Sequence, residues 1–330
     1  MTISIPLAAR RRTLLLLAAG ATLAGAAGVA GAQPADKQMR VIVPLTTGSL
    51  VDSVARAMSN ELAKVSGRPV VVENLPGAGG ITGTVQLVRA AKDGLTIALV
   101  SSNHVINPSI YKTIPFDTLK DVTPIAVIGA STMVLAVNPA LPVRNLKELV
   151  ELAKKKPGEL NMASAGNGTT LHLAGELLNT QAGVSTRHIP YKGQAPQMTD
   201  IMGGQVDMGF LAVATATPHI QAGKLRAIGV SSTTRSFVLP EVPTLAEAGL
   251  PNFNLDSWVA VVAPGDLPKE VVAKLHRTFE TVVASPEVKK QFAALGVVPR
   301  ITTPEATRAF FQQELELYAS IIKQAGIQAD

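Results

Sequence analysis

Two loops rich in hydroxyl side chains carry residue types that can bind an anion. The first contains Thr46, Thr47, Gly48 and Ser49, which follow the apolar run "VIVPL". A helical pattern begins a few residues later, near Asp52. Backbone N–H groups in the first turn of a helix have no intrahelical acceptor, so together with neighbouring hydroxyls they can bind an anion. The alternative interpretation is an ordinary turn between a strand and a helix.

The second loop has the same construction and lies in "ASAGNGTTLHLAGELL", where Thr169 or Thr170 is the expected N-cap of the following helix. The residues expected to surround the anion here are Ser164, Gly166, Asn167, Gly168 and Thr169. The glycines allow the backbone to approach the anion closely. Both loops follow the carboxyl ends of expected strands, which is where open α/β sheets bind ligands. We therefore predict that the two loops form two sides of one anion site.

Two further segments follow expected strands and could complete this site. Tyr191, Lys192 and Gly193 in "IPYKGQAP" could supply a wall, a hydroxyl and a cation for the far end of the ligand; the alternative is a surface turn. Ser101 and Asn103 in "SSNHVINPS" offer polar donors. Trp258 begins another expected strand, and we expect it to pack in the core or at a hinge rather than to contact the ligand.

Asp52 is the exception among these residues, because a carboxylate beside an anion site repels the ligand. It could instead cap its helix, fix the loop, or hold a bridging water. With a ligand that carries an amine, it could pair with the ammonium group. The sequence leaves these four roles open.

Other chemistries require motifs that the sequence does not contain. Neither loop has the lysine of a P-loop, and "GAGGITG" lacks the acidic residue that a dinucleotide site needs about 20 residues later. Ser164, Asp207 and His219 occur in the order of a hydrolase triad, but without the G-x-S-x-G motif. His172 and Glu176 could share a metal, for which no third ligand stands out. We therefore predict no catalytic residues, metal or cofactor, and keep a serine hydrolase as an alternative.

The N-terminal sequence predicts export. The formal charge of +6 includes Arg10–Arg12, and without these residues the charge is +3. This charge does not indicate a nucleic-acid-binding protein. An apolar stretch from Leu14 follows the arginines and ends in Ala30-Gly31-Ala32. This pattern predicts a signal peptide over residues 1–32 that is cut after Ala32, with a membrane anchor as the alternative. The chain has no cysteine, which excludes disulfides and thiolate metal sites.

The elements that must position the loops alternate along the chain. Short runs of Val, Ile and Leu are separated by helical patterns, which indicates parallel sheets covered on both faces. The segments "STMVLAVN" and "SWVAVVAPG" fit strands that cross between two lobes. We predict two doubly wound α/β lobes, formed by residues 33–135 with 257–330 and by residues 136–256. A cleft between such lobes is the usual place for a small ligand.

A set of segments spans nearly the whole mature chain: "VPLTTGSLVDSVAR", "VVVENLPGAGGITG", "INPSIYKTIPFDTLKDVTPIA", "GELNMASAGNGTTLHLAGELL", "IPYKGQAPQMTDIMGGQVDMGF", "GKLRAIGVSSTTRS" and "LPEVPTLAEAGLPNF". In this order they resemble the periplasmic solute-binding proteins of tripartite tricarboxylate transporters, the Bug-type receptors. The family usually has a second glycine at the position of Ser49 and an arginine at the position of Leu75.

The resemblance implies two lobes that close on a carboxylate, gripped partly through ordered waters by Thr46–Asp52 and Ser164–Thr169. It also implies a periplasmic monomer that docks transiently on membrane transporter subunits. The resulting hypothesis is a non-enzymatic receptor for an aliphatic or aromatic C4 to C9 mono-, di- or tricarboxylate. Besides the hydrolase, a receptor that docks on a signalling sensor remains an alternative.

Overall fold

The computed structural model describes residues 38–327, and from Met39 onward this part of the chain forms one compact unit. The predicted signal peptide and its cut after Ala32 lie outside the described residues. The strands are β1 (Met39–Val43), β2 (Val70–Asn74), β3 (Thr96–Ser101), β4 (Val122–Ser131), β5 (Met133–Val137), β6 (Asn161–Ser164), β7 (Arg187–Pro190), β8 (Met208–Ala212), β9 (Arg226–Val230), β10 (Ser257–Pro264) and β11 (Val297–Pro299). The helices are α2 (Leu50–Ser66), η1 (Ala78–Gly80), α3 (Ile81–Val88), α4 (Asn103–Ile110), α5 (Leu146–Lys155), α6 (Thr170–Ala182), α7 (Gln194–Gly203), α8 (Val213–Gln221), α9 (Lys269–Ala284), α10 (Pro286–Ala294) and α11 (Pro304–Ala325). Within residues 38–327, no helix is long and apolar enough to cross a membrane.

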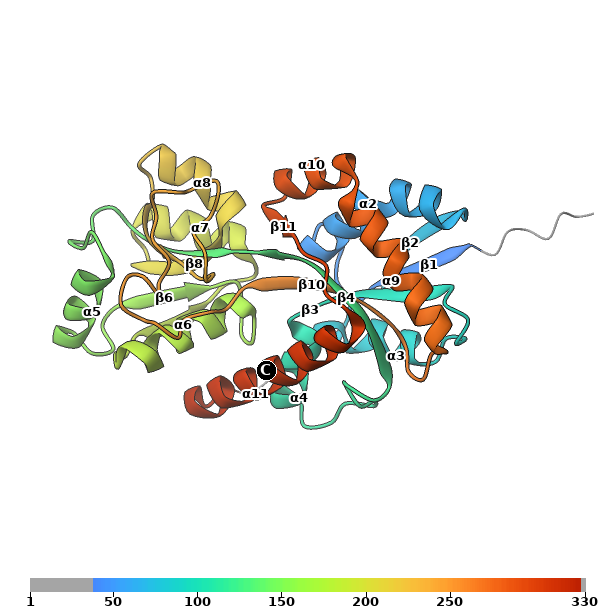
Figure 1. Cartoon of the computed structure of the whole chain (residues 1–330). Coiled ribbons are helices and arrows are strands. Elements are labelled where there is room, and N and C mark those ends of the chain that lie inside the picture. Colours follow the sequence, from blue (N-terminus) through green and yellow to red (C-terminus); the bar gives the residue numbers. More distant parts are fainter. Residues whose placement is uncertain (1–37, 328–330) are drawn as a thin grey trace, which may run out of the picture. The chain divides into compact units, whose positions relative to one another are not determined.

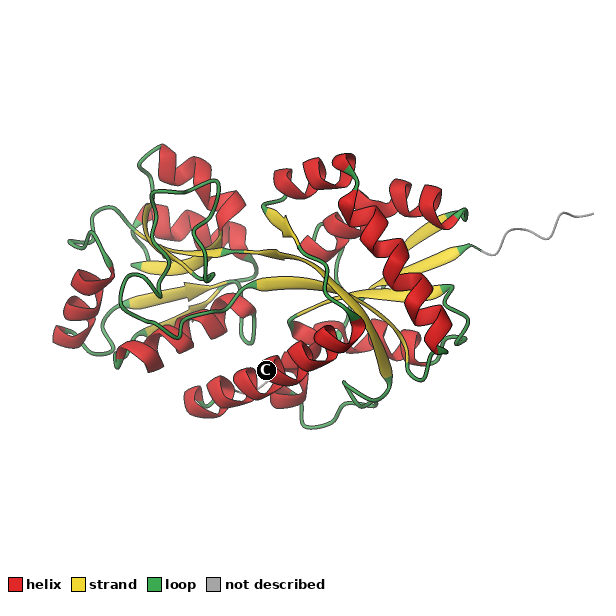
Figure 2. Ribbon diagram, in the orientation of Figure 1, coloured by secondary structure: helices red, strands yellow, loops and turns green. Residues whose placement is uncertain are grey.

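The strands form two sheets, each accompanied by its own helices (Figure 1). Sheet A has the strand order β11-β4-β10-β3-β1-β2, and sheet B has the order β7-β6-β8-β5-β9. Figure 2 shows helices on both sides of the strands in each part. The predicted two-lobe α/β fold is confirmed.

The sheets are mixed, so the expectation of parallel sheets was wrong for several strands. β1 pairs in parallel with β2 and β3, and β6 pairs in parallel with β7 and β8. In contrast, β10 is antiparallel to β3 and β4, β11 is antiparallel to β4, and β5 is antiparallel to β8 and β9. β5 and β10 each follow a strand of the other sheet, so no helical crossover within their own sheet leads into them. Such a strand can enter its sheet in the antiparallel direction.

Two connections carry the chain between the sheets. β4 ends at Ser131 in sheet A, and after Thr132 alone β5 begins at Met133 in sheet B. The chain returns at Ser257, where β10 enters sheet A between β4 and β3 (Figure 1). These are the strands expected from "STMVLAVN" and "SWVAVVAPG". The boundary expected before Ala136 falls inside β5, and the one expected before Ser257 coincides with the start of β10.

Helix α2 positions the first hydroxyl-rich loop. Its buried apolar residues recur at helical spacing and are Val51, Val54, Ala55, Met58 and Leu62. Ser49 caps the helix by accepting the Asp52 N–H at 3.2 Å. Gly67 ends it with a φ of 66°, a left-handed conformation that glycine adopts without steric cost.

Trp258 packs where β10 begins, as expected. Its side chain is buried and stacks on Phe311 of α11 with ring centroids 5.2 Å apart. Its indole N–H donates to a Glu314 oxygen at 2.9 Å. Helix α11 also packs on α4 and on α6, so it contacts helices from both parts of the fold.

Candidate functional site

A cavity of about 840 Å³ is lined by residues from the part of the chain built on sheet A and from the part built on sheet B. The sequence-predicted site residues on its wall are Thr46, Thr47, Gly48, Ser49, Asn103, Thr169 and Gly193. The other residues on the wall are Leu50, Ser53, Ser131, Met133, Ala165, Thr170, Leu171, Gln194, Ala212, Ala214, Thr215, Ser257, Ala294 and Leu295. The two hydroxyl-rich loops therefore meet at one cavity.

Five helices begin at this cavity. Leu50, Asn103, Thr170 and Gln194 are the first residues of α2, α4, α6 and α7, and Ala212 is the N-cap of α8. Each helix follows the carboxyl end of a strand, at β1, β3, β6, β7 and β8. First-turn N–H groups and the positive ends of the helix dipoles are therefore concentrated around the cavity. This electrostatic environment favours an anion.

The wall itself carries no formal charge. Among the described residues that line the cavity there is no Lys, Arg, His, Asp or Glu. An anion bound here would be held by backbone N–H groups, hydroxyls and helix dipoles. Each dipole contributes about 0.3–1 kcal/mol at an exposed helix N-terminus.

Asp52 lies behind the first loop and not on the cavity wall. Its Oδ2 accepts the Gly48 N–H at 2.9 Å, while its Oδ1 accepts from Arg56 Nε at 2.9 Å and from Asn74 Nδ2 at 3.0 Å. Burial raises the pKa of Asp52, but the bonds from Arg56, Gly48 and Asn74 outweigh this and lower the pKa overall. Of the four roles left open by the sequence, this geometry favours fixing the loop.

The two departures from the family pattern lie close to this loop. The Ser49 hydroxyl caps α2, so its oxygen is engaged with the Asp52 N–H. Leu75 donates its N–H to the Val43 carbonyl at 2.8 Å and is half-buried. Neither residue disrupts the loop or its helix.

The second loop is held from behind by Ser164. This residue is fully buried and its Oγ lies 2.6 Å from His188 Nε2. The same oxygen accepts the Gly166 N–H at 3.2 Å. Strand β6 carries Ser164 under the loop, and neither Ser164 nor Gly166 is among the wall residues, so their contact with a ligand stays a prediction.

Loop residues nearer to α6 are also engaged internally. Gly168 donates its N–H to His172 Nδ1 at 3.1 Å, and Thr169 Oγ1 accepts the His172 N–H at 3.3 Å. Thr169 is thus the N-cap of α6, as the sequence allowed. Asn167 and Gly168 are not on the cavity wall, contrary to expectation. The helix start at Thr170 and Leu171 provides wall residues instead.

His172 and His188 stack beneath this loop, with ring centroids 3.6 Å apart and an interplanar angle of 6°. Burial, and then the charge of His172, lower the pKa of His188 to about 4. His172 Nε2 lies 3.7 Å from Glu176 Oε1. Within the described part of the chain, no group of three or more His, Cys, Asp or Glu residues could hold a metal.

The residues of the alternative hydrolase triad are not assembled. Ser164 at the end of β6 is paired with His188, not with His219. Asp207 Oδ2 instead accepts the Asn161 N–H at 2.7 Å, at the opposite end of β6. Ser164 is moreover inaccessible to a substrate because it is fully buried.

Of the third predicted segment, only Gly193 lies on the cavity wall. The Tyr191 hydroxyl donates to Asp200 at 2.7 Å, and burial, with this bond, raises its pKa to about 12. Lys192 is exposed and is not among the wall residues. Tyr191 is turned toward α7, so in this structure it does not form part of the wall, and the cation role of Lys192 stays a prediction.

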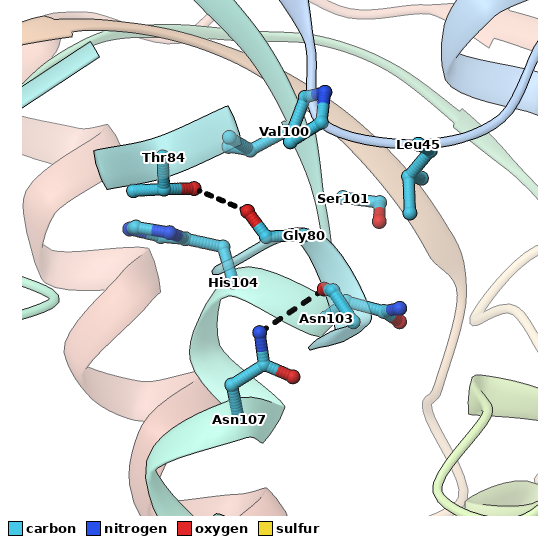
Figure 3. Close-up of a pocket in the computed structure, with 10 residues that line it drawn as sticks. Leu45, Gly80, Thr84, Val100, Ser101, Asn103, His104 and Asn107 are labelled. Carbon is cyan, nitrogen blue, oxygen red and sulfur yellow. Dashed lines mark hydrogen bonds between the residues drawn. The ribbon is translucent and has the colours of Figure 1, made fainter. Parts of the chain in front are cut away.

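Ser101 and Asn103 border a second, much smaller cavity of about 10 Å³ (Figure 3). That volume is about one water molecule. Asn107 Nδ2 donates to the Gly79 carbonyl at 3.1 Å beside it, which joins α4 to η1. Only Asn103 of the two predicted donors also lines the large cavity. Ser101 lies behind it.

Several wall residues were missed from the sequence. Ser131, Met133 and Ser257 come from the connections between the sheets. Gln194 joins two helix starts, because its Oε1 accepts the Ala212 N–H at 3.1 Å and its Nε2 donates to Thr215 Oγ1. Gly193, directly before α7, was the feature of the sequence that could have pointed to Gln194. Nothing local marks the three strand residues.

Known proteins match the chain over most of its length. Residues 54–327 match the family described as tripartite tricarboxylate transporter family receptor. The chain is 35% identical over 320 residues to Protein BugT of Bordetella pertussis, covering 95% of this chain and 98% of that one. The solved periplasmic binding protein BugD is 34% identical with a TM-score of 0.73, over 88% of this chain and 99% of that one. An R. palustris protein solved with adipate is 29% identical with a TM-score of 0.76, over 88% and 98% of the two chains.

Proposed function

Because this chain belongs to the family of tripartite tricarboxylate transporter receptors, we propose that it captures a small carboxylate in its 840 Å³ cavity and delivers it to a membrane transporter. The observation that carries the proposal is that five helices begin at this cavity, some from the part built on sheet A and some from the part built on sheet B. The cavity wall has no acidic side chain. Family and structural relatives are solute-binding proteins.

The physical chemistry of this wall suits a carboxylate. A hydrogen bond to a charged group contributes about 1.5–3 kcal/mol, and several such donors offset the cost of removing the carboxylate from water. A nucleotide would place several negative charges against a wall that has no cation. A neutral sugar would not use the helix dipoles. We therefore expect neither class to bind.

The carboxylate contacts assigned in this proposal are Thr46–Ser49, Asn103, Thr169–Leu171 and Gly193. Leu50, Met133 and Leu295 supply apolar surface for the body of the ligand. Adipate is bound in the R. palustris relative. The ligand class that we propose here is an aliphatic or aromatic C4 to C9 mono-, di- or tricarboxylate.

We also propose that the protein works in the periplasm as a monomer and docks transiently on the transporter. BugD, to which the chain is similar, is a periplasmic binding protein. Export would remove residues 1–32, so mature protein from the periplasm should begin at Gln33. An intact mass that still includes residues 1–32 would contradict this cleavage.

A thermal-shift screen of mature protein against carboxylates tests the ligand class. A ligand at 100 times its Kd adds about 2.7 kcal/mol of stability, which is easily measured. Adipate and aromatic acids should shift the melting temperature, while glucose and ATP serve as negative controls. Tight binding of a sugar or nucleotide with no response to any carboxylate would overturn the proposal. Turnover of an ester panel, abolished by Ser164→Ala, would favour the hydrolase instead.

A further inference from the structure

Two glycines make close contacts between the part of the chain built on sheet A and the part built on sheet B. Gly296, between α10 and β11, faces Ala214 of α8; a Cβ at Gly296 would lie 2.5 Å from the Ala214 Cβ. Gly168, in the loop after β6, faces Ile110 at the end of α4; a Cβ there would lie 2.5 Å from Ile110 Cδ1. Carbon atoms at optimal separation are about 3.5–4.0 Å apart. Gly296 has no room for a side chain, because Ala214 presents its Cβ and backbone there, whereas at Gly168 the end of the Ile110 side chain would have to move.

Both contacts border the ligand cavity. Leu295 precedes Gly296 on the cavity wall, and Ala214 is itself a wall residue. Thr169, directly after Gly168, lies on the wall as well. The first contact therefore limits how closely α8 approaches the sheet A part, and the second limits how closely the loop before α6 approaches the end of α4.

We propose that Gly296 and Gly168 are positioning residues for ligand capture. By carrying no side chain, they let the two parts approach closely enough for donors from both to reach one ligand. This inference rests on the proposed function. At Gly296 an added methyl group would push the two parts about 1 Å or more apart at the contact, and a hydrogen bond lengthened from about 2.9 Å by that amount is no longer formed. At Gly168 an added methyl group would displace the end of the Ile110 side chain beside the start of α6.

The conformation of these glycines must be separated from the contact they make. Gly296 and Gly168 have φ values of 66° and 67°, so alanine would strain the backbone at either position. Gly67, at the end of α2, has the same φ of 66°, but a Cβ there would meet nothing within 4 Å. Gly67→Ala is therefore a matched control that carries the backbone strain without the contact.

The first experiment measures the Kd of adipate by calorimetry. Gly296→Ala and Gly168→Ala should each weaken binding at least 10-fold, whereas Gly67→Ala should bind like wild type. Ala214→Gly should restore binding to Gly296→Ala, and Ile110→Ala should restore it to Gly168→Ala. Rescue is the result that backbone strain alone would not give, because a change in the opposing residue does not relieve that strain. Unchanged affinity in both single variants, or loss without rescue, would overturn the proposal.

A second readout does not require a bound ligand. The chain has no cysteine, so Lys147→Cys on α5 and Lys274→Cys on α9 allow two exposed positions to be spin-labelled selectively. We expect Gly296→Ala to lose the shortest label distances of the wild-type distribution, and the Gly296→Ala/Ala214→Gly variant to regain them. If adipate and the other carboxylates fail to bind wild type, the proposed ligand class is wrong, and these distances still decide the role of the glycines. A distribution that Gly296→Ala leaves unchanged would refute that role.

Discussion

Replacing Thr170 with proline tests the backbone N–H that α6 contributes to the cavity. Proline is accepted at the first position of a helix, because the N–H there has no intrahelical partner. The chain already uses this arrangement in α11, where Thr303 is the N-cap and Pro304 follows. The N-cap angles agree closely, with φ −73° and ψ 155° at Thr169 and φ −65° and ψ 160° at Thr303. The substitution should therefore remove one donor and leave α6 folded.

The expected loss follows from one hydrogen bond to a carboxylate. Such a bond contributes about 1.5–3 kcal/mol, so Kd should rise roughly 10- to 150-fold. The proline variant also loses the Thr170 hydroxyl. Thr170→Val is the matched control, since it removes the hydroxyl, keeps the N–H and has a similar volume. The ratio of the two Kd values isolates the contribution of the N–H.

Calorimetry with the strongest carboxylate from the thermal-shift screen gives these Kd values. Urea unfolding without ligand should show that Thr170→Pro remains folded, with a free energy of unfolding within about 1 kcal/mol of wild type. If the proline and valine variants bind with equal Kd while both are folded, the start of α6 does not hold the carboxylate. The argument from converging helix starts would then fail for this helix.

Three further predictions concern stability. Thr169→Ala should lower the free energy of unfolding of the ligand-free protein by about 1 kcal/mol through loss of the α6 cap, and urea unfolding identical to wild type would contradict this. Burial, and then nearby Glu314, raise the pKa of Asp256 from 3.8 to about 6 against the Ser231 hydrogen bond, so its contribution to stability is present below about pH 4 and lost as the pH rises through 6. Asp256→Asn should thus be more stable than wild type at pH 8, by on the order of 2 kcal/mol, and the difference should disappear at pH 4. For His188 the pKa falls from 6.5 to about 4, so the stability present above pH 6.5 is lost as the pH falls through 4. As the pH falls from 7 to 4, His188→Gln should therefore lose less stability than wild type. An equal fall in melting temperature for the two proteins between pH 7 and pH 4 would refute the lowered pKa of His188.

The hydrogen bonds of Asp52 explain how an acidic residue can stand next to the proposed anion site. Asp52 is engaged by Arg56, Asn74 and the Gly48 N–H, so its charge is satisfied behind the loop. The second loop is held from behind by the Ser164 hydroxyl, which contacts the His188 imidazole. Asp52 and Ser164 thus hold the two loops from behind.

Local sequence determined the elements and their ends. The apolar spacing in α2 defines a helix whose cap is Ser49 and whose end is Gly67, and Thr169 begins α6. These features depend on hydrogen bonds and packing over three or four residues, so they can be predicted from a short window. The alternation of such elements was enough to predict two α/β lobes and the strands that connect them.

Only the tertiary structure decided which side chains line the cavity. Met133 donates its N–H to Ser231 Oγ across 98 residues, and Ser257 pairs with Ser131, which is also far from it in the sequence. These pairings, with the mixed order of the strands, bring wall residues together that no periodicity connects. The burial of Ser164 under its own loop arises in the same way, because His188 comes from the neighbouring strand β7. A contact between distant segments depends on how complete sheets pack, and local residue patterns carry little information about that packing.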